Sequence, residues 1–377
     1  MQGASLAHAL HDGYTDMIYV LLPVWQAEFA LGYAALAALR GLYAGAMALF
    51  QVPAGRLAER RMRGRTVLAA GTVLSALGYA LAGFSGGLAG LCAALALSGV
   101  GSATQHPLAS AAVSRAYGSA ARGPLGVYNF AGDLGKAALP ALLGLLIVAM
   151  SWRSALWLMA AVGLVAAAAI WKLLPATDAV APAAKKSGTG AARGGFGLLL
   201  SIGVLDSGVR MGFLMFLPFL LKAKGADLPL TGFALTLVFL GGAAGKFACG
   251  WLGARFGVLA TVLATEIGTA VAIGAAMFLP LAGVLVLLPV LGVMLNGTSS
   301  VLYGTVPELV APGKEARGFA LFYTGTIGYG ALSPVLYGAI GDLTSYQWGI
   351  AAAAAAALLT CPLALLLAPK LSNVPPP

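Results

Sequence analysis

The sequence is poor in charged residues. Lys and Arg number 22 and Asp and Glu 12, together 9% of 377 residues, whereas a soluble globular protein carries about 25%. So few charges cannot cover the surface of a soluble protein of this size. The apolar content of 60% also excludes a disordered chain. The composition therefore predicts a membrane protein.

Cysteine and the common catalytic motifs are also scarce or missing. Cys92, Cys249 and Cys361 lie far apart in apolar runs, which excludes a disulfide framework or a cysteine-ligated metal. There is no Walker loop, no HExxH and no GxSxG with triad partners, so we expect neither an ATP-driven pump nor an enzyme, and no cofactor or metal. The net charge of +10 lies in short gaps between apolar runs, so we expect no nucleic-acid partner.

Long apolar segments dominate what is present. A membrane-spanning helix needs about 20 mostly apolar residues. The first run is not preceded by Lys or Arg and contains His and Asp, so we expect it to be retained as a span rather than removed as a signal peptide. The predicted spans are 5–27, 31–54, 66–85, 88–113, 122–149, 153–173, 197–221, 230–253, 258–279, 282–308, 316–341 and 346–368.

The spans divide into two similar halves. We expect a six-helix bundle over 1–174, a flexible linker rich in Pro, Ala, Gly and Lys over 175–196, and a second six-helix bundle over 197–377. Offsets of 193 to 195 residues align equivalent positions of the halves, which predicts an all-α integral membrane fold of twelve helices with a pseudo-two-fold axis along the membrane normal. The aligned pairs are Asp12 and Asp206, Asp16 and Arg210, Pro23 and Pro218, Arg60 and Arg255, Gly132 and Gly325, and Gly135 and Gly328.

The distribution of Lys and Arg predicts the orientation. With the N-terminus inside, the inner loops carry fifteen of these residues and the outer loops three, namely Arg153, Lys222 and Lys224. Inner loops are enriched in basic residues. We therefore expect a multi-pass protein of the cytoplasmic (inner) membrane with both termini and the linker in the cytoplasm.

The turn after the second span resembles a motif of the major facilitator superfamily. It runs from Gly55 through Glu59 and Arg60 to Gly64, and a second copy, from Gly250 to Gly257, includes Arg255. Together with the two six-span halves, this resemblance covers the whole chain. It implies the major facilitator fold and secondary transport by alternating access, with a small-molecule substrate, a lipid bilayer as surroundings and a monomer as the working unit.

Shorter motifs are similar to the fosmidomycin-resistance-type branch of that superfamily. They are His8 to Asp12 in the first span, Gly101 to Ser110 around His106 in the fourth, and Phe130 to Gly135 in the fifth. Leu108 replaces a Glu of the branch, Asp133 replaces an Asn, and Lys136 replaces a small residue. The branch implies proton-driven export of a small phosphonate antibiotic.

Nine Asp, Glu, Lys and Arg residues lie inside predicted spans and away from their ends, where each is a candidate for function because an unpaired charge in lipid is costly. They are Asp12, Asp16, Arg40, Asp133, Lys136, Asp206, Arg210, Lys246 and Glu266. We expect proton coupling through Asp16, Asp12, Asp133 and Asp206. Mutual neutralisation is the alternative for all nine, and for Glu266 we expect pairing within its own half.

The remaining candidates concern substrate and gating. We expect Lys136, Arg210, Lys246, His106, Tyr329 and Asp133 to bind an anionic or zwitterionic compound. Asp16 and Arg210, at equivalent places in spans 1 and 7, are expected to face each other, either as a pair that breaks during transport or as a permanent bridge. For Arg40, Glu59, Arg60 and Arg255 we expect a gating role, with Arg40 as a partner for an acid of the first span.

The function predicted is proton-coupled export of a small anionic or zwitterionic drug or metabolite by antiport. Import by proton symport, or exchange of organic anions, is the alternative. Exchange of one anion for another would need no titrating carboxylate, and the intramembrane Asp residues therefore favour protons.

Overall fold

A computed structural model describes residues 1–60, 64–120, 122–175, 195–310 and 315–371. Regular structure in these ranges is helical and includes no strand, which confirms the predicted all-α fold. Within the described ranges, eleven helical segments are long and apolar enough to cross a membrane. The first helix, α1 (Gln2–Phe29), is not among them but has 28 residues, enough to span a bilayer. Together they account for the twelve predicted spans.

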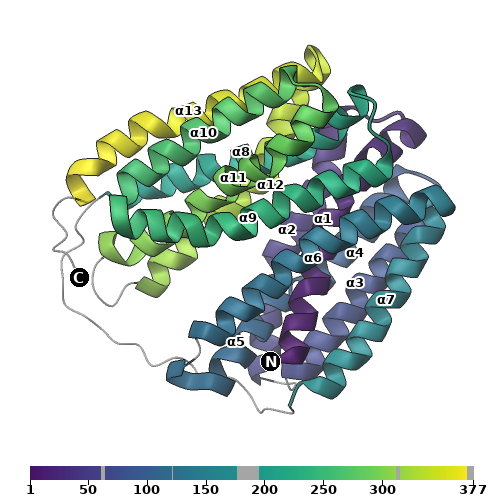
Figure 1. Cartoon of the computed structure of the whole chain (residues 1–377). Helices are drawn as coiled ribbons and strands as arrows, with labels where there is room; N and C mark the ends of the chain where they lie inside the picture. Colours follow the sequence, from purple (N-terminus) through teal and green to yellow (C-terminus); the bar gives the residue numbers. More distant parts are fainter. Residues whose placement is uncertain (61–63, 121, 176–194, 311–314, 372–377) are drawn as a thin grey trace. The chain divides into compact units, whose positions relative to one another are not determined.

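The first of two compact units comprises residues 1–182 and 226–236. In it, α1 packs against α6 and α7, and α3 packs against α4 and α7 (Figure 1). Its helices after α1 are α2 (Tyr33–Arg60), α3 (Gly64–Phe84), α4 (Leu88–Ser102), α5 (Gln105–Tyr117), the 3-10 turn η1 (Gly118–Ala120), α6 (Arg122–Ala149) and α7 (Trp152–Leu173).

The second unit comprises residues 183–225 and 237–377. Its helices are α8 (Phe196–Ala223), α10 (Val258–Phe278), α11 (Leu281–Leu309), α12 (Glu315–Leu343) and α13 (Tyr346–Leu371), together with the part of α9 (Leu228–Phe256) that follows residue 236. Here α8 packs against α12 and α13, and α10 against α11 and α13. These are the same pairings as in the first unit, so the repeat in the sequence reappears in the packing. The predicted linker 175–196 lies almost wholly outside the described residues.

The fourth predicted span is interrupted. Helix α4 ends at Ser102 and α5 begins at Gln105, with Ala103 and Thr104 between them. Pro107 has no N–H to donate to the carbonyl of Ala103, and its ring crowds that carbonyl. The break sets Gln105 and His106 in the first turn of a new helix.

The core of the first unit is tied together by tyrosines. Tyr14 of α1 is fully buried and donates a hydrogen bond to the carbonyl oxygen of Met159 on α7 at 2.6 Å. Tyr79 of α3 donates to the carbonyl oxygen of Tyr14. These bonds satisfy phenolic groups that burial would otherwise leave unpaired, and they hold α1 between α3 and α7.

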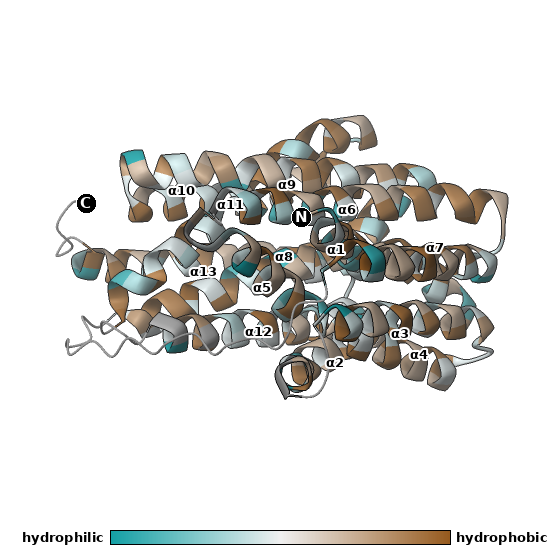
Figure 2. Ribbon diagram, turned by 90° about the horizontal axis from the view of Figure 1, so that it is seen from below, coloured by the Kyte–Doolittle hydropathy of each residue, from teal (hydrophilic) through white to brown (hydrophobic). Residues whose placement is uncertain are grey.

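Large apolar side chains are exposed along many helices. Val286, Phe278 and Leu343 are more than three-quarters exposed, and hydrophobic colouring predominates along the helices in Figure 2. In water such surfaces would drive aggregation, whereas lipid is their natural solvent. Trp152 and Trp171 lie at the two ends of α7, as expected for interfacial tryptophans.

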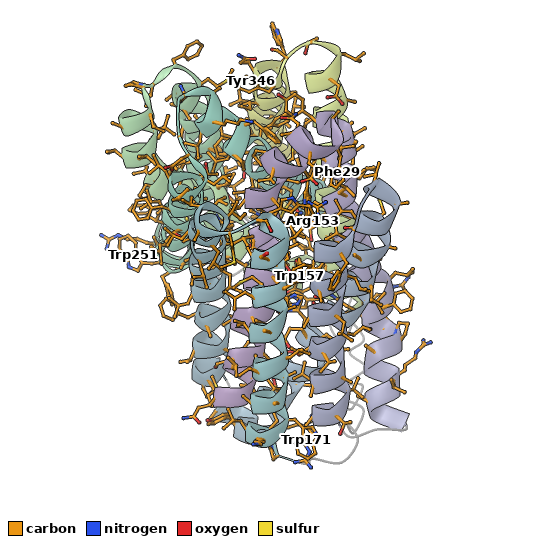
Figure 3. All side chains as sticks on the ribbon, turned by 90° about the vertical axis from the view of Figure 1, so that its right-hand side faces the viewer. Phe29, Arg153, Trp157, Trp171, Trp251 and Tyr346 are labelled. Carbon is orange, nitrogen blue, oxygen red and sulfur yellow. The ribbon has the colours of Figure 1, made fainter. Side chains whose placement is uncertain are left out.

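A polar contact lies at one end of the first unit. Phe29 and Arg153 lie at this end, and Trp171 lies at the other (Figure 3). Glu28 accepts a hydrogen bond from the Trp152 indole at 2.5 Å and pairs with Arg153 at 2.6 Å. Partial burial alone would raise the pKa of Glu28, but the indole and the guanidinium lower it below its usual value. Glu28 lies just beyond the predicted first span.

Candidate functional site

Asp12 is the centre of a charged cluster in the first unit. Its Oδ2 lies 3.2 Å from Nζ of Lys136 on α6 and 3.3 Å from Nε2 of His8, one turn earlier on α1. Asp133, on the same face of α6, contributes a second carboxylate 4.0 Å from Lys136. The Asp12 side chain is 9% exposed and that of Lys136 28%, so the lysine is the accessible member of the pair.

Two glycines allow α6 to bring Lys136 to Asp12. A Cβ added to Gly135 would collide with the carbonyl group of Ala9 on α1. A Cβ added to Gly132 would lie 2.6 Å from Oδ2 of Asp12 and 2.8 Å from the His8 ring. Only glycine permits such close backbone approach. The Gly-x-x-Gly pattern of the fifth span therefore has a direct structural role in building the cluster.

One ring nitrogen of His8 faces the Asp12 carboxyl group. Nδ1 of His8 lies 2.9 Å from the carbonyl oxygen of Tyr128, which only accepts hydrogen bonds, so Nδ1 carries a hydrogen. Nε2 then faces the Asp12 carboxylate, and two acceptors cannot bond to each other. A hydrogen bond across this contact therefore needs one further proton, either on the imidazole or on the carboxyl group. The His8 ring also stacks on the Tyr128 ring at 4.1 Å between centroids.

His11 and His106 complete the cluster. The His106 ring packs edge-on against His8 at 5.3 Å and His11 at 4.6 Å between centroids. Ligand atoms of His8, Asp12 and His106 all lie within 4.8 Å of one another, a spacing that could hold a metal ion. The ammonium group of Lys136 is a cation 3.2 Å from an oxygen of the same Asp12 carboxyl group.

A small polar cavity of about 20 Å³ adjoins His11. Its lining includes Thr72, Ser75, Ser102 and Gln105, and its volume suits one water molecule. The buried side-chain amide of Gln105 and Nδ1 of His11 have no hydrogen-bond partner in the described part of the chain. The break between α4 and α5 thus presents polar groups to the imidazole cluster.

Asp16 pairs with Arg40 of α2. Their Oδ1 and Nη2 atoms lie 3.5 Å apart with both side chains buried, and the Arg40 guanidinium also covers the Tyr19 ring at 4.4 Å. Arg40 is therefore the partner of a first-span acid, as predicted. The phenol of Tyr43 nearby contacts the hydroxyl groups of Thr15 and Ser102 at 3.2 and 2.6 Å.

The corresponding region of the second unit contains two carboxyl groups and an arginine. Nη2 of Arg210 lies 3.7 Å from Oδ2 of Asp206, one turn earlier on α8. Asp206 and Glu266 lie close enough for their carboxyl groups to interact electrostatically, so Glu266 has an interaction partner within its own half. Asp16 and Arg210, expected to face each other, each have an ionic partner in their own unit.

The other predicted residues occupy separate positions. The carbonyl group of Lys246 accepts a hydrogen bond from Ser300 at 3.3 Å. Tyr329 packs where a Cβ on Gly208 would be, and Arg255 is exposed and lies over Trp251 and Phe256. The side chains of Glu59 and Arg60 are outside the described residues.

Sequence reasoning missed several contributors. The sequence alone does not predict that the Tyr128 carbonyl group and the Gln105 amide belong to the site, because only the packing of the helices places them beside the histidines. The proximity of Glu266 to Asp206 was equally hidden, since sixty residues separate two acids that share no helix face. The break around Pro107 was the one available indication for Gln105.

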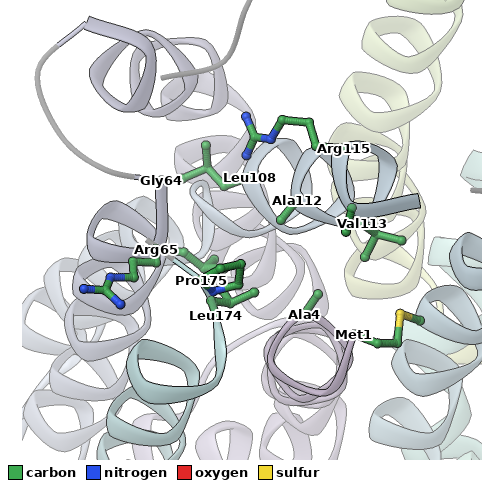
Figure 4. A pocket seen from close by; sticks show the side chains of 12 residues that line it. Met1, Ala4, Gly64, Arg65, Leu108, Ala112, Val113, Arg115, Leu174 and Pro175 are labelled. Atoms are coloured by element: carbon green, nitrogen blue, oxygen red, sulfur yellow. The ribbon is translucent and has the colours of Figure 1, made fainter. Parts of the chain in front are cut away.

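A larger cavity of about 210 Å³ lies at the ends of α1, α3, α5 and α7 (Figure 4). Its lining is largely apolar, from Met1, Ala4 and Leu108 among others, with Arg65 and Arg115 as the basic members. None of the predicted site residues lines it, although Ala4 lies one turn before His8 on α1.

Fold and site together define a helical membrane transporter. The sequence matches the Major Facilitator Superfamily over residues 4–205 and again over 199–377, and the chain belongs to this family. It is thus a secondary transporter working by alternating access, not an enzyme, and a multi-pass membrane protein. No curated protein matches it.

Solved transporters share the fold. A bacterial homologue of the human lysosomal transporter Spinster, inward-facing and unoccupied, is 15% identical with a TM-score of 0.82, covering 99% of this chain and 97% of its own. A single-residue mutant of the nucleoside transporter NupG is 13% identical, with a TM-score of 0.77 and 98% of each chain covered. A peptide transporter, POT, in complex with sulfate is 15% identical, with a TM-score of 0.79 and coverage of 100% and 95%.

Proposed function

We propose that the protein couples proton movement to the transport of a small anionic or zwitterionic compound, and exports it by antiport. It acts as a monomer in the cytoplasmic membrane with both termini inside. The observation that carries this proposal is the buried Asp12 carboxyl group, which lies 3.2 Å from Lys136 and 3.3 Å from His8. A proton that binds to Asp12 therefore binds to the same carboxyl group that Lys136 contacts.

This arrangement supplies a coupling mechanism. When Asp12 is ionised, it neutralises Lys136 at 3.2 Å, and the ammonium group is engaged. Together the two groups offer one charge of each sign, Lys136 to the anionic group of a zwitterionic substrate and Asp12 to its cationic group. Protonation of Asp12 removes the negative partner and releases the substrate, and loss of the proton restores the site, so that proton and substrate bind in turn, as antiport requires. Asp133, with an oxygen 4.0 Å from Lys136, tunes the same balance.

The remaining candidates take supporting roles. His106 borders the Asp12 cluster and offers a ring nitrogen to substrate, while Arg210, Lys246 and Tyr329 are the residues that the second unit contributes. Asp16 and Asp206 are further proton acceptors, each beside an arginine. Arg40, Glu59, Arg60 and Arg255 act in gating.

Two further observations support a small charged substrate and export. Among structures with this fold, a peptide transporter was solved with alafosfalin and a POT family transporter with 5-aminolevulinic acid, so this architecture accommodates charged or zwitterionic molecules. The motifs at His8, His106 and Gly132 resemble the fosmidomycin-resistance-type branch, which implies export of a phosphonate.

The test uses purified protein in liposomes that enclose a pH-sensitive dye. Small anions are screened, phosphonates and carboxylates first, under an imposed pH gradient. We expect a substrate-dependent proton flux that Lys136→Ala abolishes, in the direction of antiport. Flux in the opposite direction would instead identify an importer. Tracer exchange of anions without any proton movement would contradict proton coupling and identify an exchanger.

A further inference from the structure

All three histidines of the chain lie in one cluster of the first unit. His8 and His11 are buried on α1, and the partly buried His106, in the first turn of α5, contacts both rings at 5.3 and 4.6 Å between centroids. No sequence motif indicates this convergence, because His106 lies far along the chain from the other two. A substrate contact by His106 does not require three imidazoles, so the cluster calls for a further explanation.

The spacing between His8 and Asp12 fits the coordination shell of a metal ion. Nε2 of His8 lies 3.3 Å from Oδ2 of Asp12. A tetrahedral zinc ion with bonds of about 2.0–2.1 Å separates its ligand atoms by about 3.3 Å. A ring nitrogen of His106 is the third ligand, since the ligand atoms of all three residues lie within 4.8 Å of one another. A modest movement of the His106 ring completes a site with three protein ligands and one open position for water.

His8 is already oriented as a metal ligand. Its Nδ1 lies 2.9 Å from the carbonyl oxygen of Tyr128, so Nδ1 carries the hydrogen and the lone pair of Nε2 faces Asp12. Metal-ligating histidines usually donate their other ring N–H to a carbonyl or carboxylate group in this way, which fixes the tautomer and the ring. Stacking on the Tyr128 ring at 4.1 Å between centroids holds the imidazole further. His11 offers a reserve nitrogen, because its Nε2 lies 3.9 Å from Oδ1 of Asp12.

The ligand atoms select the ion, and Lys136 competes with it. Imidazole nitrogens and one carboxylate suit Zn²⁺ and similar transition-metal ions, whereas Mg²⁺ prefers oxygen ligands and keeps several waters. The three cysteines are free and lie far apart in the sequence, so they form no rival cluster. Nζ of Lys136 lies 3.2 Å from the same oxygen of Asp12 that an ion would bind. The lysine side chain is 28% exposed and flexible, so it can move aside.

We propose that His8, Asp12 and His106 bind a divalent transition-metal ion of the Zn²⁺ type, which displaces Lys136 from Asp12 and blocks transport. The ion acts as an inhibitory ligand, because it occupies the carboxylate that proton and substrate use in turn. This inhibition rests on the proposed function, whereas metal binding itself does not.

Calorimetric titration of the purified full-length protein with Zn²⁺ tests the site directly, after removal of any affinity tag and of bound metal. We expect one Zn²⁺ per chain, no binding of Mg²⁺, and binding at least about tenfold weaker in His106→Ala. Lys136→Met should bind Zn²⁺ about tenfold more tightly, because no ammonium group competes for Asp12. Misfolding cannot produce such a gain. Lys172→Met, which removes an exposed ammonium group from the last turn of α7, is the matched control and should bind Zn²⁺ as the wild type does.

Three results would each overturn the site: no Zn²⁺ binding by the wild type, equal affinity in the wild type and His106→Ala, or binding by Lys136→Met no tighter than by Lys172→Met. If His106→Ala does not fold, His106→Gln must weaken binding instead, and unchanged affinity would overturn the site equally.

The titration also separates this inference from the proposed function, because it needs neither substrate nor gradient. Failure of proton-coupled flux in liposomes would reject the transport proposal while leaving Zn²⁺ binding in place. Where flux is present, Zn²⁺ should inhibit it at concentrations near its dissociation constant, and a chelator should restore it. Flux that saturating Zn²⁺ leaves unchanged would overturn the inhibitory role.

Discussion

The two units place an aspartate at equivalent points of their first helices and surround it with opposite chemistry. Asp12 has a lysine and an imidazole as partners, whereas Asp206 has an arginine and a second carboxyl group. An excess of cations favours the ionised carboxylate, while a neighbouring acid favours a bound proton. The repeated fold therefore supplies equivalent positions, and the partners on neighbouring helices decide what each position does.

Replacing Lys136 should have the largest effect, because it is the accessible cation of the Asp12 cluster. We expect Lys136→Met to weaken substrate binding by about 2 kcal/mol or more, roughly thirtyfold, because the anionic group of the substrate loses its ammonium partner. The measurement is substrate-dependent flux in liposomes. Lys136→Arg keeps the charge and should retain part of the activity, and equal flux for Met and Lys would refute the assignment.

Breaking the buried Asp16–Arg40 pair should mainly affect stability. Arg40→Met leaves Asp16 buried without its partner at 3.5 Å, at a cost of about 3 kcal/mol. Thermal unfolding in detergent measures this loss. Adding Asp16→Asn to Arg40→Met should recover much of it, because the unpaired charge is gone. A double variant no more stable than the single one would show that the two residues act independently.

A pair of equivalent glycines sharpens the comparison between the units. Gly135→Ala places a methyl group against the carbonyl group of Ala9, whereas the equivalent Gly328 has open space around it. We expect Gly135→Ala to cost about 1–3 kcal/mol and to reduce flux by moving α6 away from Asp12. Gly328→Ala is the matched control and should be nearly neutral in the same thermal assay. Similar losses from both would contradict the account of α6 packing.

The Glu28–Arg153 contact should contribute least, because both side chains are about one-third exposed. The pKa of Glu28 is lowered in the folded protein. Its contribution to the free energy of unfolding is therefore present above the unfolded pKa and lost as pH falls through the folded pKa. We expect Glu28→Gln to lower stability by about 1 kcal/mol or less at neutral pH and to have no effect in strong acid. A constant difference across the acid range would contradict this.

Much of the fold could be predicted from the sequence, because in lipid an apolar run long enough to span must be a helix. The twelve spans and the weak point before Pro107 follow from local composition. The pairing of Arg40 with a first-span acid could also be predicted, since a buried arginine needs one. The sequence could not predict which acid lies next to which partner, for example that Glu266 lies near Asp206. That depends on how helices far apart in the chain pack.

The measurement that tests the central claim most directly compares Asp12→Asn with the wild type in the same liposomes, once a substrate is known. Counterflow of labelled substrate at equal pH needs no net proton movement, whereas accumulation driven by a pH gradient does. The account predicts that Asp12→Asn retains counterflow and loses gradient-driven accumulation, because substrate exchange persists without the titrating carboxyl group. Retention of both activities would contradict the assignment of Asp12 as the site where proton and substrate are coupled.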